Sequence, residues 1–190
     1  MKFCKPFYNA STFNISQRFG ENPQIYGAVG HQAIDLFPFS TLTATMLVAP
    51  EDVKIIKLVD ARKIDDSLAP LERGFGVLMQ SIEFPDMYHV YWHCSPIFPV
   101  EEGDIVKRGE IVAQMSNSGF VISRGQIIPL DIRSIPPYLG THLHWEYYIL
   151  MNGVKTYLDP LPKIDWDTNV KGSPLDAIAK ILNKIKNLLT

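Results

Sequence analysis

The stretch Gly140-Thr141-His142-Leu143-His144-Trp145-Glu146-Tyr147 places two histidines one residue apart in an apolar, aromatic run. Side chains at positions i and i+2 of a β-strand face the same side, so a strand here projects both imidazoles together, with Cα atoms roughly 6.6 Å apart. Histidine costs free energy to bury and often serves as a metal ligand or proton carrier. The stretch therefore predicts a strand that carries a functional site, although an amphipathic strand with two half-exposed histidines fits the same pattern.

An upstream segment, Gly30-His31-Gln32-Ala33-Ile34-Asp35, supplies a third histidine and a carboxylate. A catalytic zinc ion takes three protein ligands from histidine, cysteine or carboxylate side chains and leaves a fourth position for water. In an extended strand His31 and Asp35 would lie about 13 Å apart, too far to share one ion. If both bind the same ion, the chain must bend or bulge at Gln32-Ala33. Taken alone, the pair also fits two side chains that face solvent.

A third segment, residues 88–95, contains His89 and His93, which strand alternation places on the same face. We interpret His93 as a candidate site residue and His89 as a partly exposed strand residue. Cys94 alternates to the other face and is interpreted as a small buried residue rather than a metal ligand. With His89 set aside, four of the five histidines lie in three segments that can converge.

The three segments, in this order, resemble the lysostaphin-type zinc metallopeptidases, which cut the peptide bridges or stems of the bacterial cell wall. That family carries a His-x-x-x-Asp segment, then a lone histidine in a strand, then a His-x-His strand. Further matches are Gln17-Arg18-Phe19-Gly20, the turn region 103–110, Asn117-Ser118-Gly119 and Asp159-Pro160. The resemblance covers about residues 14–162 and rests on the combination of motifs.

The resemblance implies that His31, Asp35 and His144 bind one zinc ion per chain. It assigns His142 as the general base that takes a proton from the attacking water. His93 is expected to assist by a hydrogen bond to that water or to the developing oxyanion.

Two further side chains are candidates through the same resemblance. Tyr26 is a candidate for polarising the scissile carbonyl. Glu146 shares the strand face of the paired histidines, so it can orient a ligand imidazole, and it fits a rim residue equally. The chain departs from the family at Ala33, where glycine is usual, and in two long loops, residues 60–73 and 120–139. These loops are expected to wall the groove and so to bear on the substrate more than on the chemistry.

The residues also fit the chemistry of amide hydrolysis directly. Zinc lowers the pKa of a bound water to about 7 and polarises a carbonyl. A histidine beside that water can accept its proton, because an unperturbed imidazole titrates near about pH 6.5. Ligand histidines must be neutral to bind metal, so activity is expected to fall in acid.

Composition limits the class of protein. A chain of 190 residues with 46% hydrophobic and 20% charged residues is typical of a globular domain with a core. A net charge of -2 without a basic run argues against a nucleic-acid partner. Two cysteines do not make a disulfide framework.

No segment approaches the roughly 20 apolar residues of a membrane span, and the N-terminus shows no signal-peptide pattern. Together with the family resemblance, this suggests a phage-encoded bacteriolytic enzyme. Such an enzyme would be cytoplasmic before release, or virion-associated, and would act at the bacterial cell wall.

Short strand-like runs, punctuated by 14 prolines and 12 glycines, predict a mainly β fold of antiparallel sheets with long loops. The expected strands are residues 44–49, 53–59, 76–84, 89–93, 105–106, 110–115 and 142–151. Asn152-Gly153 predicts a two-residue hairpin turn. Lys107-Arg108-Gly109 is expected to turn a second hairpin.

We expect a metallopeptidase domain over residues 14–162 and a linker with an amphipathic helix over residues 163–190. Ser173 is a candidate N-cap and Pro174 a first helical residue. A helical stripe follows at spacings of three and four: Leu175, Ile178, Leu182, Ile185 and Leu189. This helix is expected to pack on its own sheet or on a partner copy. A helix at an anionic membrane surface, or an anchor to a larger assembly, is the alternative.

The leading hypothesis is a zinc-dependent endopeptidase that hydrolyses peptide bonds of peptidoglycan. The alternative is a catalytically inactive wall-binding or virion structural module that retains the peptidase fold. Such relatives typically lose ligand or base positions, and all of these positions are intact in this sequence. A biotinyl or lipoyl carrier is a further possibility, because residues 104–110 resemble its hairpin, but Lys107 lacks the expected flanking residues.

Overall fold

The computed structural model of the chain describes residues 2–8, 13–38, 45–60, 73–123, 126–133, 138–167 and 173–189. Most of the predicted loop 60–73, residues 61–72, lies outside the described residues. So do residues 124–125 and 134–137 of the second predicted loop.

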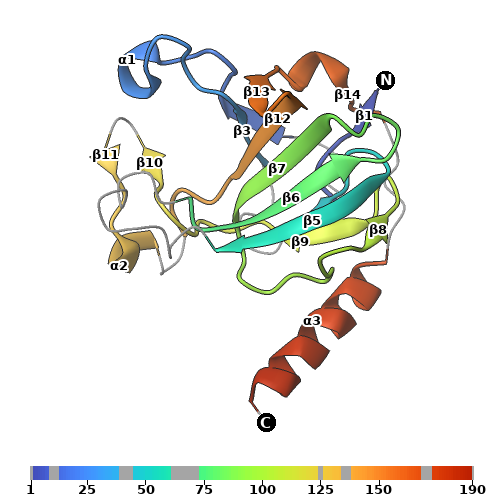
Figure 1. The fold of residues 1–190 in the computed structure, drawn as a ribbon. Coiled ribbons are helices and arrows are strands. Elements are labelled where there is room, and N and C mark those ends of the chain that lie inside the picture. Colours follow the sequence, from blue (N-terminus) through green and yellow to red (C-terminus); the bar gives the residue numbers. More distant parts are fainter. Residues whose placement is uncertain are drawn as a thin grey trace.

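An eight-stranded sheet forms the main body of the described chain (Figure 1). Its order is β2-β3-β12-β7-β6-β5-β8, with β13 paired to β12, and every neighbouring pair is antiparallel. Its strands are β2 (Phe13–Gln17), β3 (Ile34–Pro38), β5 (Val53–Asp60), β6 (Phe75–Ser81), β7 (Met87–Cys94), β8 (Ile105–Val106), β12 (Leu143–Met151) and β13 (Val154–Tyr157).

Three smaller pairings complete the strands. β4 (Met46–Val48) pairs antiparallel with β9 (Ile111–Gln114), β10 (Ile122–Ser123) pairs antiparallel with β11 (Gln126–Ile127), and β1 (Phe3–Cys4) pairs parallel with β14 (Ile164–Asp165). The helices are α1 (Pro23–Tyr26), α2 (Leu130–Arg133), the 3-10 helix η3 (Leu161–Lys163) and α3 (Pro174–Leu188). The predicted mainly β fold of antiparallel sheets with a C-terminal helix is confirmed.

The core lies between one face of the main sheet and the β4–β9 pair. Leu143, Trp145 and Tyr147 alternate along β12 toward this core and are fully buried. Leu47 of β4 and Ala113 of β9 close it from the other side. Strand alternation then turns the even-numbered residues of β12 to the opposite face of the sheet. Packing of the core thus determines which residues the outer face presents.

The core also includes side chains from both ends of the chain. Phe3, Phe7 and Ile164 belong to the main buried cluster, although they lie outside the residues 14–162 expected for the catalytic domain. The division of the chain at residue 162 stays a prediction. Cys4 and Cys94 are both buried and free, as expected for a chain without a disulfide framework.

One predicted hairpin forms and the other does not. Asn152 and Gly153 both adopt positive φ, 52° and 78°, as a two-residue hairpin turn requires, and β12 pairs with β13 across them. Residues 107–109 also turn, but β8 pairs with β5 whereas β9 pairs with β4. The expected second hairpin is therefore wrong. The chain turns a corner between two sheets, where Asp52 accepts hydrogen bonds from Nζ of Lys107 and from the backbone N–H of Arg108.

Helix α3 begins as predicted, with Oγ of Ser173 accepting a hydrogen bond from the backbone N–H of Asp176. It extends below β5 and β9 in the view of Figure 1, and Nζ of Lys184 donates to the carbonyl of Val100 at 2.9 Å. Ala177 is its buried residue, whereas Leu175 and Leu182 of the predicted stripe are 75% and 59% exposed. The expected packing of the stripe on its own sheet is thus not seen, and association with a partner copy or a membrane stays a prediction. Within the described residues, no helix has the length and apolar character needed to cross a bilayer.

His89 is not the partly exposed residue that the sequence suggests. Its side chain is 0% exposed, and Nε2 lies 2.8 Å from Oε1 of Glu51. Nε1 of Trp145 donates to Nδ1 of His89 at 3.2 Å, and Oγ of Ser81 donates to Oε2 of Glu51 at 2.8 Å. Burial lowers the pKa of His89, partly offset by Glu51, so the imidazole is neutral. The histidine belongs to a satisfied polar network inside the core.

This network predicts that Glu51→Ala destabilises the fold by about 1–3 kcal/mol, because the variant leaves buried polar groups of His89 and Ser81 unsatisfied. Urea unfolding at pH 7 measures the change. Glu83→Ala, which removes an exposed glutamate, is the matched control and should leave the free energy of unfolding nearly unchanged. Equal midpoints for the two variants would contradict the role of the network.

Candidate metal centre

The centre is built on the pairing of β3 with β12. In this antiparallel pair Asp35 lies directly opposite His144, so both side chains project from the outer face of the sheet. Oδ1 of Asp35 lies 2.9 Å from Nδ1 of His144. Nε2 of His31, from the segment before β3, lies 3.2 Å from the same nitrogen and 3.5 Å from the same oxygen. Three potential ligand atoms thus meet at one point.

The predicted bend brings His31 to this point. Residues 32 and 33 form a bend, after Gly30 with φ of 68°. A Cβ on Gly30 would lie 2.2 Å from the carbonyl oxygen of Gly20, so only glycine fits that close approach. The backbone N–H of Gly20 donates to the carbonyl of His31 at 2.8 Å and fixes the crossing. Ala33 is not among the described residues with positive φ, so the glycine usual in the family is not required there.

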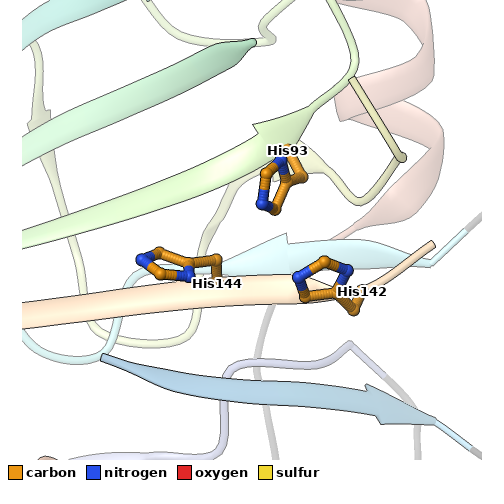
Figure 2. Close-up of side chains that lie close together, drawn as sticks. All are labelled: His93, His142 and His144. Atoms are coloured by element: carbon orange, nitrogen blue, oxygen red, sulfur yellow. The ribbon is translucent and has the colours of Figure 1, made fainter. Parts of the chain in front are cut away.

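His142 and His93 lie beside His144 (Figure 2). Nε2 of His142 lies 3.7 Å from Oδ2 of Asp35, and the rings of His142 and His93 are 4.6 Å apart. Nδ1 of His142 lies 2.6 Å from the carbonyl oxygen of Gly140, and Nδ1 of His93 lies 2.7 Å from the carbonyl oxygen of Ser118. A carbonyl only accepts, so each Nδ1 carries the proton and each Nε2 presents a lone pair.

His93 reaches the centre through a β-bulge. The register between β6 and β7 shifts between Phe75 and Val77, and His93 itself has φ of 59°. A bulge redirects a side chain relative to simple alternation. His93 therefore lies beside His142 and His144, while His89 packs against Trp145 and Tyr147 in the core. The expectation that His89 and His93 share one face is wrong for this reason.

Residues 116–118 hold His93 and His142 in place. Oγ of Ser118 donates to the carbonyl of Cys94 at 2.7 Å and accepts from the backbone N–H of Phe75 at 3.0 Å. The backbone N–H of His142 donates to the carbonyl of Ser116 at 3.3 Å. The resemblance to the peptidase family points to this loop, but it does not indicate that the carbonyls of Ser118 and Gly140 accept hydrogen bonds from His93 and His142. Backbone acceptors leave no side-chain signal that a sequence pattern can report.

The two remaining candidates also lie near the centre. The Tyr26 ring is 4.9 Å from the His31 ring, and its hydroxyl donates to Oε1 of Gln17 at 3.3 Å. Oε1 of Glu146 lies 3.7 Å from Nε2 of His144, beyond hydrogen-bond range, and Glu146 instead pairs with Arg73. Sequence reasoning did not anticipate Arg73, which follows a long loop.

Electrostatics favour a neutral set of histidines around one carboxylate. Burial lowers the pKa of His31, lowers that of His93 well below the usual value, and lowers that of His144 to about 4. Burial alone would raise the pKa of Asp35, but the imidazoles of His142 and His144 outweigh it and hold the pKa below its usual range. The three imidazoles are thus neutral at neutral pH, so each can offer one unprotonated ring nitrogen to a metal.

Two groups of described residues have donor atoms close enough for one ion. They are His31, Asp35 and His144, and His93, His142 and His144. The first is the better site because it includes a carboxylate and because its contacts lie between 2.9 and 3.5 Å. Oδ1 of Asp35 and Nδ1 of His31 are buried without a hydrogen-bond partner among the described residues. An orphaned carboxylate oxygen at the meeting point fits a cation ligand.

Comparison with solved structures shows the fold. A putative glycyl-glycine endopeptidase LytM from Ruminococcus gnavus aligns with a TM-score of 0.64 and 17% identity over 90% of this chain and 63% of that one. The catalytic domain of the antimicrobial peptidase lysostaphin from Staphylococcus simulans gives 0.54 and 20% over 79% and 90%. A zinc containing peptidase from Vibrio cholerae gives 0.53 and 18% over 83% and 39%.

The chain thus spans less than two thirds of the Vibrio and Ruminococcus structures. No family model and no curated protein matches the sequence. At these identities the likeness establishes the fold, and the resemblance to lysostaphin-type peptidases that the motifs indicated is confirmed at that level.

Gly119 crosses Gly74 closely in the loop that holds His93. Gly119 has φ of 76°, and a Cβ there would lie 2.1 Å from the backbone nitrogen of Gly74. Gly153, with φ of 78°, has nothing within 4 Å of such an atom and is a matched control. Gly153→Ala should cost about 1–2 kcal/mol from left-handed strain alone. Gly119→Ala should cost clearly more in urea unfolding, and equal losses would show that the loop crossing is not tight.

Proposed function

We propose that this chain is a zinc-dependent endopeptidase that hydrolyses peptide bonds in bacterial peptidoglycan. The observation that carries the proposal is the convergence of Nε2 of His31, Oδ1 of Asp35 and Nδ1 of His144, with two further imidazoles beside them. Two histidines and one carboxylate are a ligand set of catalytic zinc sites, which keep one position open for water. The likeness in fold to solved peptidases supports the same reading.

A bound zinc ion would supply Lewis acidity toward the scissile carbonyl and lower the pKa of a coordinated water to about 7. Proton transfer and the orientation of water and substrate are proposed for side chains of this protein. His142 is the general base, because Nδ1 donates to Gly140 and Nε2 is left as the proton acceptor on the side of Asp35. The same histidine can return the proton to the leaving amine.

His93 is proposed to orient the attacking water. Its Nδ1 proton is held by the Ser118 carbonyl, and burial keeps the pKa of the ring well below the usual value. A neutral ring in this tautomer offers Nε2 as an acceptor, so it accepts a hydrogen bond from the water rather than donating one to an oxyanion. This favours the first of the two roles that the resemblance implies.

Tyr26 is proposed to donate a hydrogen bond to the substrate carbonyl. Burial and the nearby Asp35 raise the pKa of its phenol, so the hydroxyl keeps its proton at neutral pH. The hydroxyl now donates to Gln17, and the side chain is 39% exposed, so substrate can replace that partner. Glu146 lies 3.7 Å from Nε2 of His144 and is proposed to act on that imidazole through its charge rather than on substrate.

Peptidoglycan as substrate is proposed from the relatives. One solved structure of this fold is described as a putative glycyl-glycine endopeptidase, and another as an antimicrobial peptidase. A third is described as a prophage-encoded M23 protein, from Enterococcus faecalis, which accords with a phage-encoded bacteriolytic enzyme acting at the cell wall. An inactive wall-binding module is the less favoured function, because both non-ligand histidines keep Nε2 free beside the ligand set.

The ligand assignment predicts about one zinc ion per purified chain. His144→Ala removes the donor that both other ligands approach, so zinc content measured by plasma mass spectrometry should fall close to zero. His142→Ala serves as the control, since it should retain the metal. Undiminished zinc in the His144→Ala protein would remove the assignment.

The general-base role predicts that His142→Ala retains zinc and fold but digests purified sacculi at least about a hundredfold more slowly. Turbidity loss gives the rate, and mass spectrometry of the released peptides identifies the bond cut. His89→Gln, a histidine change in the core, controls for loss of an imidazole elsewhere. Digestion by the His142→Ala protein at the parental rate would exclude this role.

The pKa shifts predict how zinc affinity changes in acid. Protonation of a ligand competes with metal, and burial holds the pKa of His31 and His144 below the usual value, that of His144 at about 4. Affinity, measured by competition with a chelator, should therefore change little between pH 7 and pH 6 and fall steeply as the pH approaches 4. A steep fall between pH 7 and 6 would mean that the ligands titrate like free imidazole.

A further inference from the structure

The outer face of the main sheet continues past the metal centre along β12. His144, Glu146 and Tyr148 alternate onto this face, and Trp92 lies opposite His144 on the neighbouring strand β7. On the other side of β12, Tyr157 of β13 lies opposite Tyr148. Glu146 and Tyr148 are themselves buried, so the exposed groups on the β13 side of the centre are the side chains that cover them.

Arg73 is the first charged group on this surface. Its guanidinium pairs with Glu146 and lies over the Trp92 ring, 5.6 Å from the ring centre. The side chain remains 47% exposed, whereas that of Glu146 is 3% exposed. Arginine has five N–H donors in a planar fork, and among the described residues Glu146 is its one ion-pair partner. The guanidinium is thus held beside Glu146 and stays partly accessible to solvent.

Lys155 is the second cation on the same surface. Its Nζ lies 4.5 Å from the centre of the Tyr148 ring, and no carboxylate among the described residues pairs with it. The two cations lie over Glu146 and Tyr148, which are two residues apart on the same face of β12. Burial and then the charge of Arg73 lower the pKa of Lys155, in accord with this placement. Among the described residues of this surface, two cations and one buried carboxylate leave a surplus positive charge.

We propose that Arg73 and Lys155 form a subsite that binds a carboxylate of the substrate peptide. The inference rests on the proposed function and narrows its substrate to peptides with a carboxylate close to the bond cut. By the rise of a strand, the Cα atoms of Glu146 and Tyr148 lie about 7 Å and about 13 Å beyond that of His144. The guanidinium of Arg73 is closer to the centre, because its partner Oε1 of Glu146 lies 3.7 Å from Nε2 of His144. A carboxylate on a residue next to the bond cut can therefore reach Arg73, and one about two to four residues away can reach Lys155.

This charge arrangement discriminates between two kinds of wall peptide. A glycine bridge carries no side-chain carboxylate and gains nothing from the two cations. A cross-link through D-alanine and diaminopimelate carries free carboxylates near the scissile bond, and Arg73 can bind one of them through two parallel hydrogen bonds. The subsite therefore favours the second kind of cross-link.

The test uses three synthetic probes with the zinc-loaded, full chain. They are a D-alanine–diaminopimelate cross-linked peptide with free carboxylates, the same peptide with the diaminopimelate carboxylates amidated, and pentaglycine. The parent protein should show kcat/KM about tenfold or more in favour of the free carboxylate form over the amidated form, with pentaglycine cleaved more slowly still.

Two variants locate the effect. Lys155→Ala removes an exposed side chain, and Arg73→Lys keeps a charge beside Glu146 but loses the fork. Each should lower the ratio of kcat/KM for the free carboxylate form to kcat/KM for the amidated form about fivefold to tenfold. Lys186→Ala, on the distant helix α3, makes the same charge change as Lys155→Ala and should leave both values as in the parent.

Binding to the His142→Ala protein, measured by calorimetry, separates this inference from the proposed function. Tighter binding of the free carboxylate form without cleavage of any probe by the parent would support the subsite and contradict the peptidase. Cleavage of free and amidated forms at equal rates would overturn the subsite and leave the peptidase intact. Equal binding without cleavage would overturn both.

Discussion

The antiparallel register between β3 and β12 is the constraint on which the metal centre depends. Asp35 and His144 face each other across this pair only because Ile34 and Leu36 on one strand, and Leu143 and Trp145 on the other, are fully buried on the opposite face. A slip by one residue would turn these apolar side chains to solvent and the ligands into the core. Hydrophobic burial thus determines the register, and the register positions two donor atoms 2.9 Å apart.

Two backbone carbonyls orient the histidines that are not assigned as ligands. His93 and His142 come from different strands, yet each donates Nδ1–H to a carbonyl in a loop that glycine makes possible. Gly140 supplies one carbonyl directly, and the tight crossing of Gly119 with Gly74 holds the other, on Ser118. The two rings therefore share one tautomer and present the same nitrogen to the centre. An outer face that carried only ligands would bind metal but could not move a proton.

Strand alternation was sufficient to predict the shared face of the paired histidines, and the short strand-like runs between prolines and glycines predicted the fold class. The bend before Asp35 followed from the requirement that His31 and Asp35 reach one ion. Strand alternation failed where the backbone leaves the regular strand, because the bulge at His93 reverses a side chain that parity places with His89. It also failed for His89, whose partner Glu51 lies 38 residues away and reaches it only in the folded core. Pairing between distant segments, such as Arg73 with Glu146, has no local signal in the sequence.

The pair of Arg73 and Glu146 links the metal centre to the proposed carboxylate subsite. A buried carboxylate 3.7 Å from a ligand imidazole would favour the protonated ring, and a protonated ring cannot bind metal. Arg73 opposes this, because it neutralises Glu146 and its charge lowers the pKa of His144 further. The guanidinium is half exposed while it pairs with Glu146, so a group beside the proposed ligand His144 also reaches solvent. The cation that offsets the charge of Glu146 is thereby the one proposed to select an anionic peptide.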